Sequence, residues 1–185
     1  APDIMVAAVD TSLVRFSSAK PQDRNRVEIF FDREIAPGSF DVAFDGLDIA
    51  GWFVSEGEPK KVSVATSEQT EGKKYAITKL AAGDRFGNGL EPSSGTMEFI
   101  GTAQADTSAL EIVEKRPKVM IPGREPLRLT FNRVLAAFDS GSVVADASGE
   151  RLSVSRRGAN VLEILPADSW RENTNYQFTF DREIG

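Results

Sequence analysis

The fold is decided by one stretch, Val27-Glu28-Ile29-Phe30-Phe31-Asp32-Arg33-Glu34-Ile35, which returns 100 residues later as Leu127-Arg128-Leu129-Thr130-Phe131-Asn132-Arg133-Val134-Leu135. In both copies apolar side chains fall on alternate positions, as in a strand that buries one face. The repeat extends in both directions, because Asp10-Thr11-Ser12 recurs as Asp106-Thr107-Ser108 and the two Tyr residues of the chain occupy matching places. The chain therefore contains two copies of one unit.

The remaining predicted strands also come in matching pairs. They are residues 62–65 with 161–165, 75–80 with 176–180, and 12–17 with 108–115, followed by 97–100 near the end of the first copy. By propensity residues 108–115 alone could form a helix, but Val14 and Phe16 in the matching segment favour a strand. Short strands separated by turns such as Asp45-Gly46 predict an all-β chain of two tandem antiparallel sandwiches.

We expect three segments along the chain. Residues 10–103 form the first domain, residues 104–185 form the second, and residues 1–9 form an extended leader. A chain of 185 residues has room for two domains of this size, each with a modest core.

Composition excludes most familiar catalytic chemistry. The chain has no His and no Cys, which excludes Ser-His-Asp triads, Cys-His nucleophiles, Cys/His zinc sites and disulfides. With 28 acidic and 22 basic side chains, the net charge of -6 opposes binding to nucleic acid. No apolar run approaches the roughly 20 residues that span a bilayer, so no transmembrane segment is expected. The start at Ala1, without Met, fits either a removed signal peptide or a piece of a longer protein.

The motifs resemble those of bacterial Ig-like domains that occur in tandem on S-layer and other surface proteins. The resemblance rests on the Phe-Asp/Asn-Arg strand end, on a strand that begins with Tyr after a polar corner, and on the closing turn Asp84-Arg85-Phe86-Gly87-Asn88-Gly89-Leu90. It covers residues 10–101 well and residues 106–180 in part. It implies a secreted or cell-surface bacterial protein whose partners are other repeats of the same protein or array.

The second copy departs from this pattern near its end. The sequence stops at Gly185, about where the second closing turn is expected, so the last strand of the second sandwich is apparently missing. Residues 2–9 resemble the closing strand of a preceding repeat. Two interpretations stay open: the sequence is a segment cut from a longer array, or residues 2–9 of one molecule complete the second sandwich of another.

Three aromatic residues are candidate site residues. Tyr75 and Tyr176 follow polar corners, where a Tyr hydroxyl can bond the backbone across the connection, and we interpret both as structural Tyr corners. Trp170 aligns with Gln69 or Thr70 at a polar connection. An exposed indole there would offer a stacking platform for sugars, whereas the alternative is an indole folded over its own loop.

Asp10, Asp84 and Asp106 lie at the repeat boundaries and in the closing turn. Carboxylates in such loops can hold Ca²⁺, so these three are candidate calcium ligands. The alternative is turn chemistry, in which each Asp accepts hydrogen bonds from its own backbone, and this is favoured because no EF-hand spacing is present. No other cofactor is expected.

The sequence therefore predicts a non-enzymatic structural or adhesive repeat. The contrasting hypotheses are a carbohydrate-binding or accessory module of a larger extracellular enzyme, with a polysaccharide or host surface as partner, and a unit that assembles by strand exchange.

Overall fold

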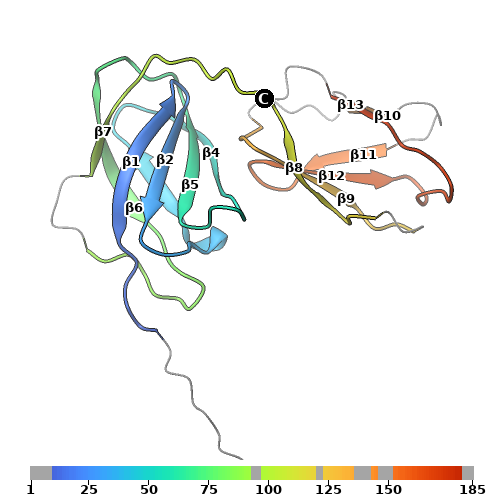
Figure 1. The fold of residues 1–185 in the computed structure, drawn as a ribbon, viewed down its shortest axis with the longest axis horizontal. Coiled ribbons are helices and arrows are strands. Elements are labelled where there is room, and N and C mark those ends of the chain that lie inside the picture. The colour runs from blue at the N-terminus through green and yellow to red at the C-terminus, as the bar shows by residue number, and fades with distance from the viewer. Residues whose placement is uncertain (1–9, 93–96, 120–122, 136–142, 146–151, 181–185) are drawn as a thin grey trace, which may run out of the picture.

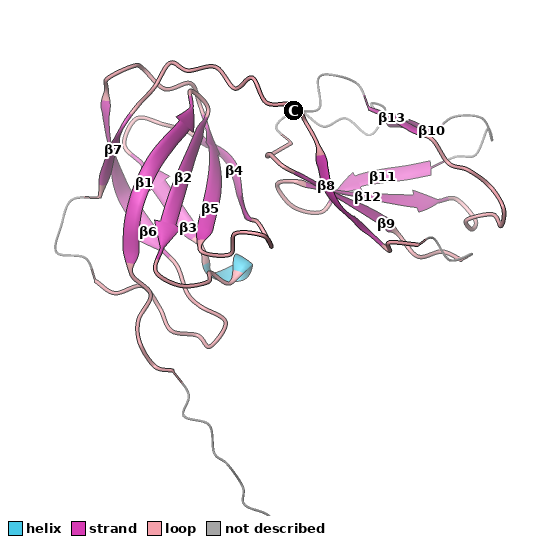
Figure 2. Ribbon diagram, viewed as in Figure 1, coloured by secondary structure: helices cyan, strands magenta, loops and turns pink. Residues whose placement is uncertain are grey.

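The computed structural model describes residues 10–92, 97–119, 123–135, 143–145 and 152–180. The protein is an all-β sandwich protein, and the helical structure of the described part is one 3-10 turn, Pro37–Ser39 (Figures 1 and 2). No helix in this part has the length and apolar character needed to cross a membrane.

Seven strands are described in the first half of the chain, residues 10–103. They are β1 (Phe16–Asp23), β2 (Arg26–Phe31), β3 (Asp41–Phe44), β4 (Ile49–Val54), β5 (Lys61–Thr66), β6 (Lys74–Ala81) and β7 (Glu98–Ile100). One antiparallel sheet has the order β1-β2-β5-β4 and the other has the order β3-β6-β7.

Six strands are described in the second half. They are β8 (Ile112–Arg116), β9 (Leu127–Phe131), β10 (Val143–Ala145), β11 (Leu152–Arg156), β12 (Val161–Pro166) and β13 (Phe178–Phe180). The antiparallel sheet β11-β12-β9-β8 has the strand order of its counterpart in the first half, β4-β5-β2-β1. Strands β10 and β13 pair with each other, as β3 and β6 do.

The predicted strands are confirmed, including residues 112–116, where the repeat outweighed local helix propensity. Several boundaries were wrong: β1 and β8 each begin four residues later than predicted, at Phe16 and Ile112, and β13 begins at Phe178. Among the described residues of the second half, no strand corresponds to β7. Residues 2–9 and 181–185, on which the hypotheses of a missing or donated strand depend, lie outside the described part.

The core of the first half lies between its two sheets. Val27, Ile29, Val62 and Val64 are fully buried from one sheet, and each contributes about 1.5–3 kcal/mol relative to an exposed side chain. From the other sheet, Phe99 stacks on Tyr75 with ring centroids 5.5 Å apart.

Each of the two tryptophans packs with the core of a different half. Trp52 on β4 packs against the first core and meets the Phe40 ring edge-on, with centroids 4.9 Å apart. Trp170 belongs to a second cluster that includes Leu129, Leu162 and Ile164.

The free edges of the large sheets differ in character. β1 carries Lys20 and Pro21, and Pro has no N–H to offer to a neighbouring strand. β4 lies at the other edge of the same sheet and is apolar at Trp52, Phe53 and Val54.

Candidate functional site

The repeated Phe-Asp/Asn-Arg motif fastens the opening segment of each half to its sheet. In the first half, Asp32 accepts a hydrogen bond from the Arg15 N–H at 2.8 Å through Oδ1, and its own N–H donates to the Arg15 carbonyl at 3.1 Å. Next to it, the Arg33 guanidinium donates to the Ser12 carbonyl at 2.8 Å and pairs with Asp10 at 3.1 Å. The motif thus uses three consecutive positions for three different contacts. Phe31 fills the core, Asp32 holds the backbone of the opening segment, and Arg33 pairs with a carboxylate.

The second half repeats these contacts. Asn132 accepts a hydrogen bond from the Glu111 N–H at 3.1 Å and donates its own N–H to the Glu111 carbonyl. Arg133 donates to the Ser108 carbonyl and pairs with Asp106 at 3.2 Å. Because Asp and Asn both offer a side-chain oxygen, the substitution between the copies preserves the contact. We call these two sets of contacts the segment clamps.

The closing turn adds a further anchor to the first clamp. The Asp84 carboxylate accepts hydrogen bonds from the N–H groups of Phe86 and Asn88, both at 2.9 Å, and from the Asn88 side chain. The Arg33 guanidinium contacts Oδ2 of the same carboxylate at 3.3 Å, the oxygen that also accepts the Asn88 side chain. Burial opposes ionisation of Asp84, but the hydrogen bonds from Asn88, Phe86 and Arg33 outweigh it and lower its pKa to about 2.

The three candidate calcium ligands fall into two separate places. Asp10 and Asp84 are brought together, but the Arg33 guanidinium contacts both of them, at 3.1 and 3.3 Å, so their facing oxygens already have a cationic partner. Asp106 lies in the other clamp with Arg133. Within the ranges that the structure describes, no group of three acidic side chains is arranged to hold a metal. The turn chemistry is present in each case, since the N–H two residues further on donates to Asp10 and to Asp106.

The two Tyr hydroxyls occupy equivalent positions. Tyr75 accepts a hydrogen bond from the Thr70 N–H at 2.9 Å, and Tyr176 accepts one from the Arg171 N–H at 3.0 Å. Both bonds reach back five residues across the preceding corner. Tyr75 is 2% exposed, whereas Tyr176 is half-buried. Their contribution to stability stays a prediction, which is developed in the Discussion.

Of the two alternatives for Trp170, the structure shows the buried indole and not the exposed sugar platform. Its side chain is 3% exposed, its indole N–H donates to the Glu125 carbonyl at 2.6 Å, and its ring meets Tyr176 edge-on. The aligned residue Gln69 is buried in the same way and donates to the Asp23 carbonyl at 3.0 Å. Gln69 in the first copy is therefore a buried hydrogen-bond donor, and its polarity does not indicate exposure to solvent.

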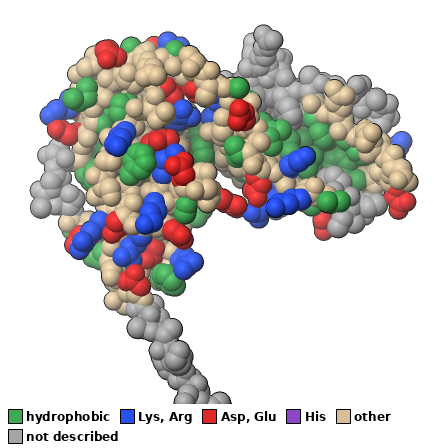
Figure 3. Space-filling model, in the orientation of Figure 1, with side chains coloured by type: hydrophobic (Ala, Val, Ile, Leu, Met, Phe, Trp, Pro, Cys, Tyr) green, Lys and Arg blue, Asp and Glu red, His purple; other side chains and the backbone are tan. Residues whose placement is uncertain are grey.

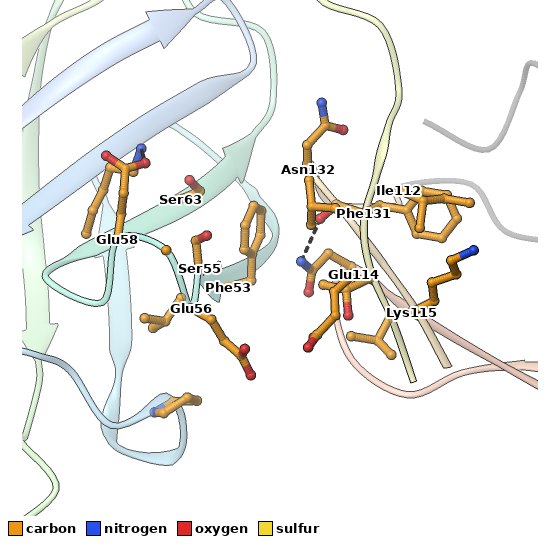
Figure 4. A pocket seen from close by; sticks show the side chains of 18 of the residues that line it. Phe53, Ser55, Glu56, Glu58, Ser63, Ile112, Glu114, Lys115, Phe131 and Asn132 are labelled. Atoms are coloured by element: carbon orange, nitrogen blue, oxygen red, sulfur yellow. Dashed lines mark hydrogen bonds and ion pairs between the residues drawn. The ribbon is translucent and has the colours of Figure 1, made fainter. Parts of the chain in front are cut away.

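A cleft of about 1350 Å³ lies between the two halves (Figure 4). One wall carries Phe53, Ser55 and Glu56 from the first half, and the facing wall carries Ile112 and Lys115 from the second, among other residues.

Charges within the cleft are largely paired inside the protein. Lys61 pairs with Glu28 at 3.1 Å and also with Glu58. On the wider surface of the first half, basic and acidic side chains are interspersed and form no field of one sign on the visible face (Figure 3). The Lys61, Glu28 and Glu58 charges on this wall of the cleft are therefore engaged with one another.

The residues that join the two halves escaped the sequence analysis. Arg26 on β2 lies 3.8 Å from the Asp106 carboxylate, and Arg116 on β8 donates through Nη2 to both carboxylate oxygens of Glu56, at 2.9 and 3.1 Å. Neither pair follows from the repeat, because Arg26 aligns with Pro126 and contacts between copies leave no repeated pattern.

Comparisons with known proteins give little further guidance. No family model and no curated protein matches the sequence. Among solved structures, the chain is similar to the S-layer protein rSbsC(31-844), with 15% identity and a TM-score of 0.38. The match covers 91% of this chain and 26% of that one, so the chain spans about a quarter of the length of the protein it matches. A TM-score this low carries no argument about function.

Proposed function

We propose that the chain is a non-enzymatic structural segment of a secreted or cell-surface protein, in which two sandwiches act as a spacer under tension. The observation that supports the proposal is the segment clamp, because the same motif fastens the opening segment in both halves. The location at a cell surface comes from the family resemblance of the sequence. The competing idea of a carbohydrate-binding module loses its one sequence feature, since Trp170 is buried.

The path of the chain favours resistance to tension in the first half. The chain enters this sandwich at one end and leaves it at the opposite end, so tension runs along the strands (Figure 1). Hydrogen bonds between strands lie across that direction and are therefore sheared together, not opened one after another.

The opening segment and the closing turn are joined in a geometry that suits this load. Val14 forms a parallel bridge with Leu90, in which the Val14 N–H donates to Gly89 at 2.9 Å and the Glu91 N–H donates to Val14 at 2.7 Å. Arg15 pairs with Glu91 at 2.8 Å. Because the two segments run in the same direction and belong to opposite ends of the unit, tension pulls them past each other along their length. These contacts then share the load.

Single-molecule force spectroscopy tests the proposal on the full chain held between two marker domains. We expect a resolved force peak for the first half. Asp32→Ala removes the oxygen that accepts the Arg15 N–H and should lower this peak. Asp32→Asn is the matched control, because Asn132 makes the same contact in the second half. Extension without a resolvable peak, or equal effects of the two substitutions, would overturn the proposal.

A further inference from the structure

The two segment clamps are chemically alike, but their carboxylates differ in one contact. Asp10 and Asp106 each accept the backbone N–H of a Ser two residues further on, and each pairs with the Arg of its own half. Asp106 has an additional partner, Arg26, which belongs to β2 of the other half. The second clamp is therefore connected to the first sandwich through one carboxylate.

The surroundings of Asp106 favour a fixed geometry. Its side chain is 23% exposed, and the Arg26 and Arg133 side chains are 20% and 19% exposed. Arg26 also pairs with Asp23 of its own half, whose carboxylate lies 3.1 Å from the guanidinium and is 5% exposed. Partial burial reduces solvent screening, and the additional partner limits the freedom of the Arg26 side chain.

Two other contacts between the halves lie elsewhere. At Gly51 on β4, an added Cβ would lie 3.2 Å from Ala159 Cβ and 3.3 Å from Val134 Cγ1, so the halves touch there. The pair Glu56–Arg116 spans the cleft, but these side chains are 74% and 59% exposed, and exposed pairs contribute little. Of the two ion pairs between the halves in the described residues, the one at Asp106 is better shielded.

We infer that the Asp106 carboxylate, held between Arg26 of the first half and Arg133 of the second, fixes the angle between the two sandwiches. Gly51 acts as the contact point about which the halves would otherwise rotate, since its missing side chain lets the β4 backbone approach the Ala159 and Val134 side chains. This inference goes beyond the proposed function, because a chain can hold a fixed angle whether or not it resists force.

Distance measurement by electron spin resonance tests the inference on the full chain. The chain has no native Cys, so Ser17→Cys and Ser169→Cys place one spin label on an exposed position of each half. In the parent protein we expect a narrow distance distribution. Asp106→Asn keeps an oxygen for the backbone turn but removes the charge, and it should broaden the distribution well beyond the parent width.

Two variants separate this effect from damage to the clamp. Asp10→Asn makes the same change in the first half, where no contact between the halves is lost, and should leave the distribution unchanged. Arg26→Met removes the contact between the halves while Asp106 keeps Arg133, and should broaden the distribution as Asp106→Asn does. The inference is wrong if Asp106→Asn and Arg26→Met overlay on the parent, or if Asp10→Asn broadens the distribution equally. Cooperative urea unfolding of both halves in each variant verifies that the variants are folded.

Discussion

Replacing Tyr75 by Phe removes one oxygen atom from the first core and leaves the ring packed against Phe99. The lost interaction is the hydrogen bond from the Thr70 N–H, 2.9 Å long, to a side chain that is 2% exposed. A bond of this kind contributes about 1 kcal/mol, so we expect Tyr75→Phe to lower the free energy of unfolding of the first half by about that amount. With a urea m-value of about 1 kcal/mol/M for a unit of this size, the unfolding midpoint should fall by about 1 M.

Tyr176→Phe is the matched variant in the second half. Its hydrogen bond to the Arg171 N–H has nearly the same length, 3.0 Å, but lies at an exposed position where water can replace the hydroxyl. We therefore expect a loss of about 0.5 kcal/mol or less. Because both variants lose a hydrogen bond of similar length, the difference between their losses of stability measures the effect of burial on that bond.

The assay uses the two tryptophans of the chain as separate reporters. In protein labelled with 5-fluorotryptophan, the fluorine resonance of Trp52 follows the first core and that of Trp170 follows the second. A urea titration then gives one midpoint for each half. The reasoning is refuted if Tyr75→Phe leaves the Trp52 midpoint unchanged, or if the two substitutions shift their respective midpoints equally.

Three further changes have defined expected outcomes. Gly101→Ala would bring a Cβ within 2.7 Å of a backbone oxygen and of a Tyr75 ring carbon, so we expect a loss of about 1–3 kcal/mol in the first half, measured by urea unfolding. Gly89→Ala, with no atom within 4 Å of the added Cβ, is the control, and an equal loss in both variants would contradict the steric explanation. The pKa of Asp84 in the folded protein is about 2, below the value of about 3.9 for an unfolded Asp, so its contribution to stability is present above about pH 4 and is lost as the pH falls towards 2. Accordingly, Asp84→Asn should lower the urea unfolding midpoint at pH 7. The difference in midpoint between variant and parent should become smaller between pH 4 and pH 2. A difference that stays constant over this range would mean that Asp84 acts through packing and not through its charge. Millimolar Ca²⁺ compared with EDTA should leave the melting temperature unchanged, because the Arg33 guanidinium already contacts both Asp10 and Asp84, whereas a rise of several degrees would identify a calcium site.

The fold could be predicted largely because the sequence contains two copies of one unit, and the two copies can be compared with each other. Residues 108–115 favour a helix in isolation, and only the match to Val14 and Phe16 indicated the strand that the structure shows at β8. The same match paired Asp32 with Asn132, but it could not reveal what they bind. Their partner is the backbone of a segment about 20 residues earlier in the chain, and a backbone contact leaves no signature in side-chain identity.

Two kinds of information were not accessible from the pattern. The sequence left two alternatives for Trp170, an exposed platform and an indole folded over its own loop, because its polar counterpart Gln69 did not reveal that this position is buried; a buried amide is acceptable when its donors are satisfied. The contacts of Arg26 with Asp106 and of Arg116 with Glu56 join one copy to the other. They depend on the relative placement of the two halves, and a repeat aligned with itself carries no information on that placement.

The unlike edges of the first large sheet have a consequence for crowding. A protein packed at high density among copies of itself meets other sheet edges constantly, and a flat apolar edge would fuse with them into insoluble aggregates. Here the apolar edge strand β4 contributes Phe53 and Val54 to the cleft, opposite β8 of the same molecule. The edge at β1 carries Lys20 and Pro21, which do not accommodate a further strand. Both edges of this sheet are thus protected against pairing with a strand of another copy.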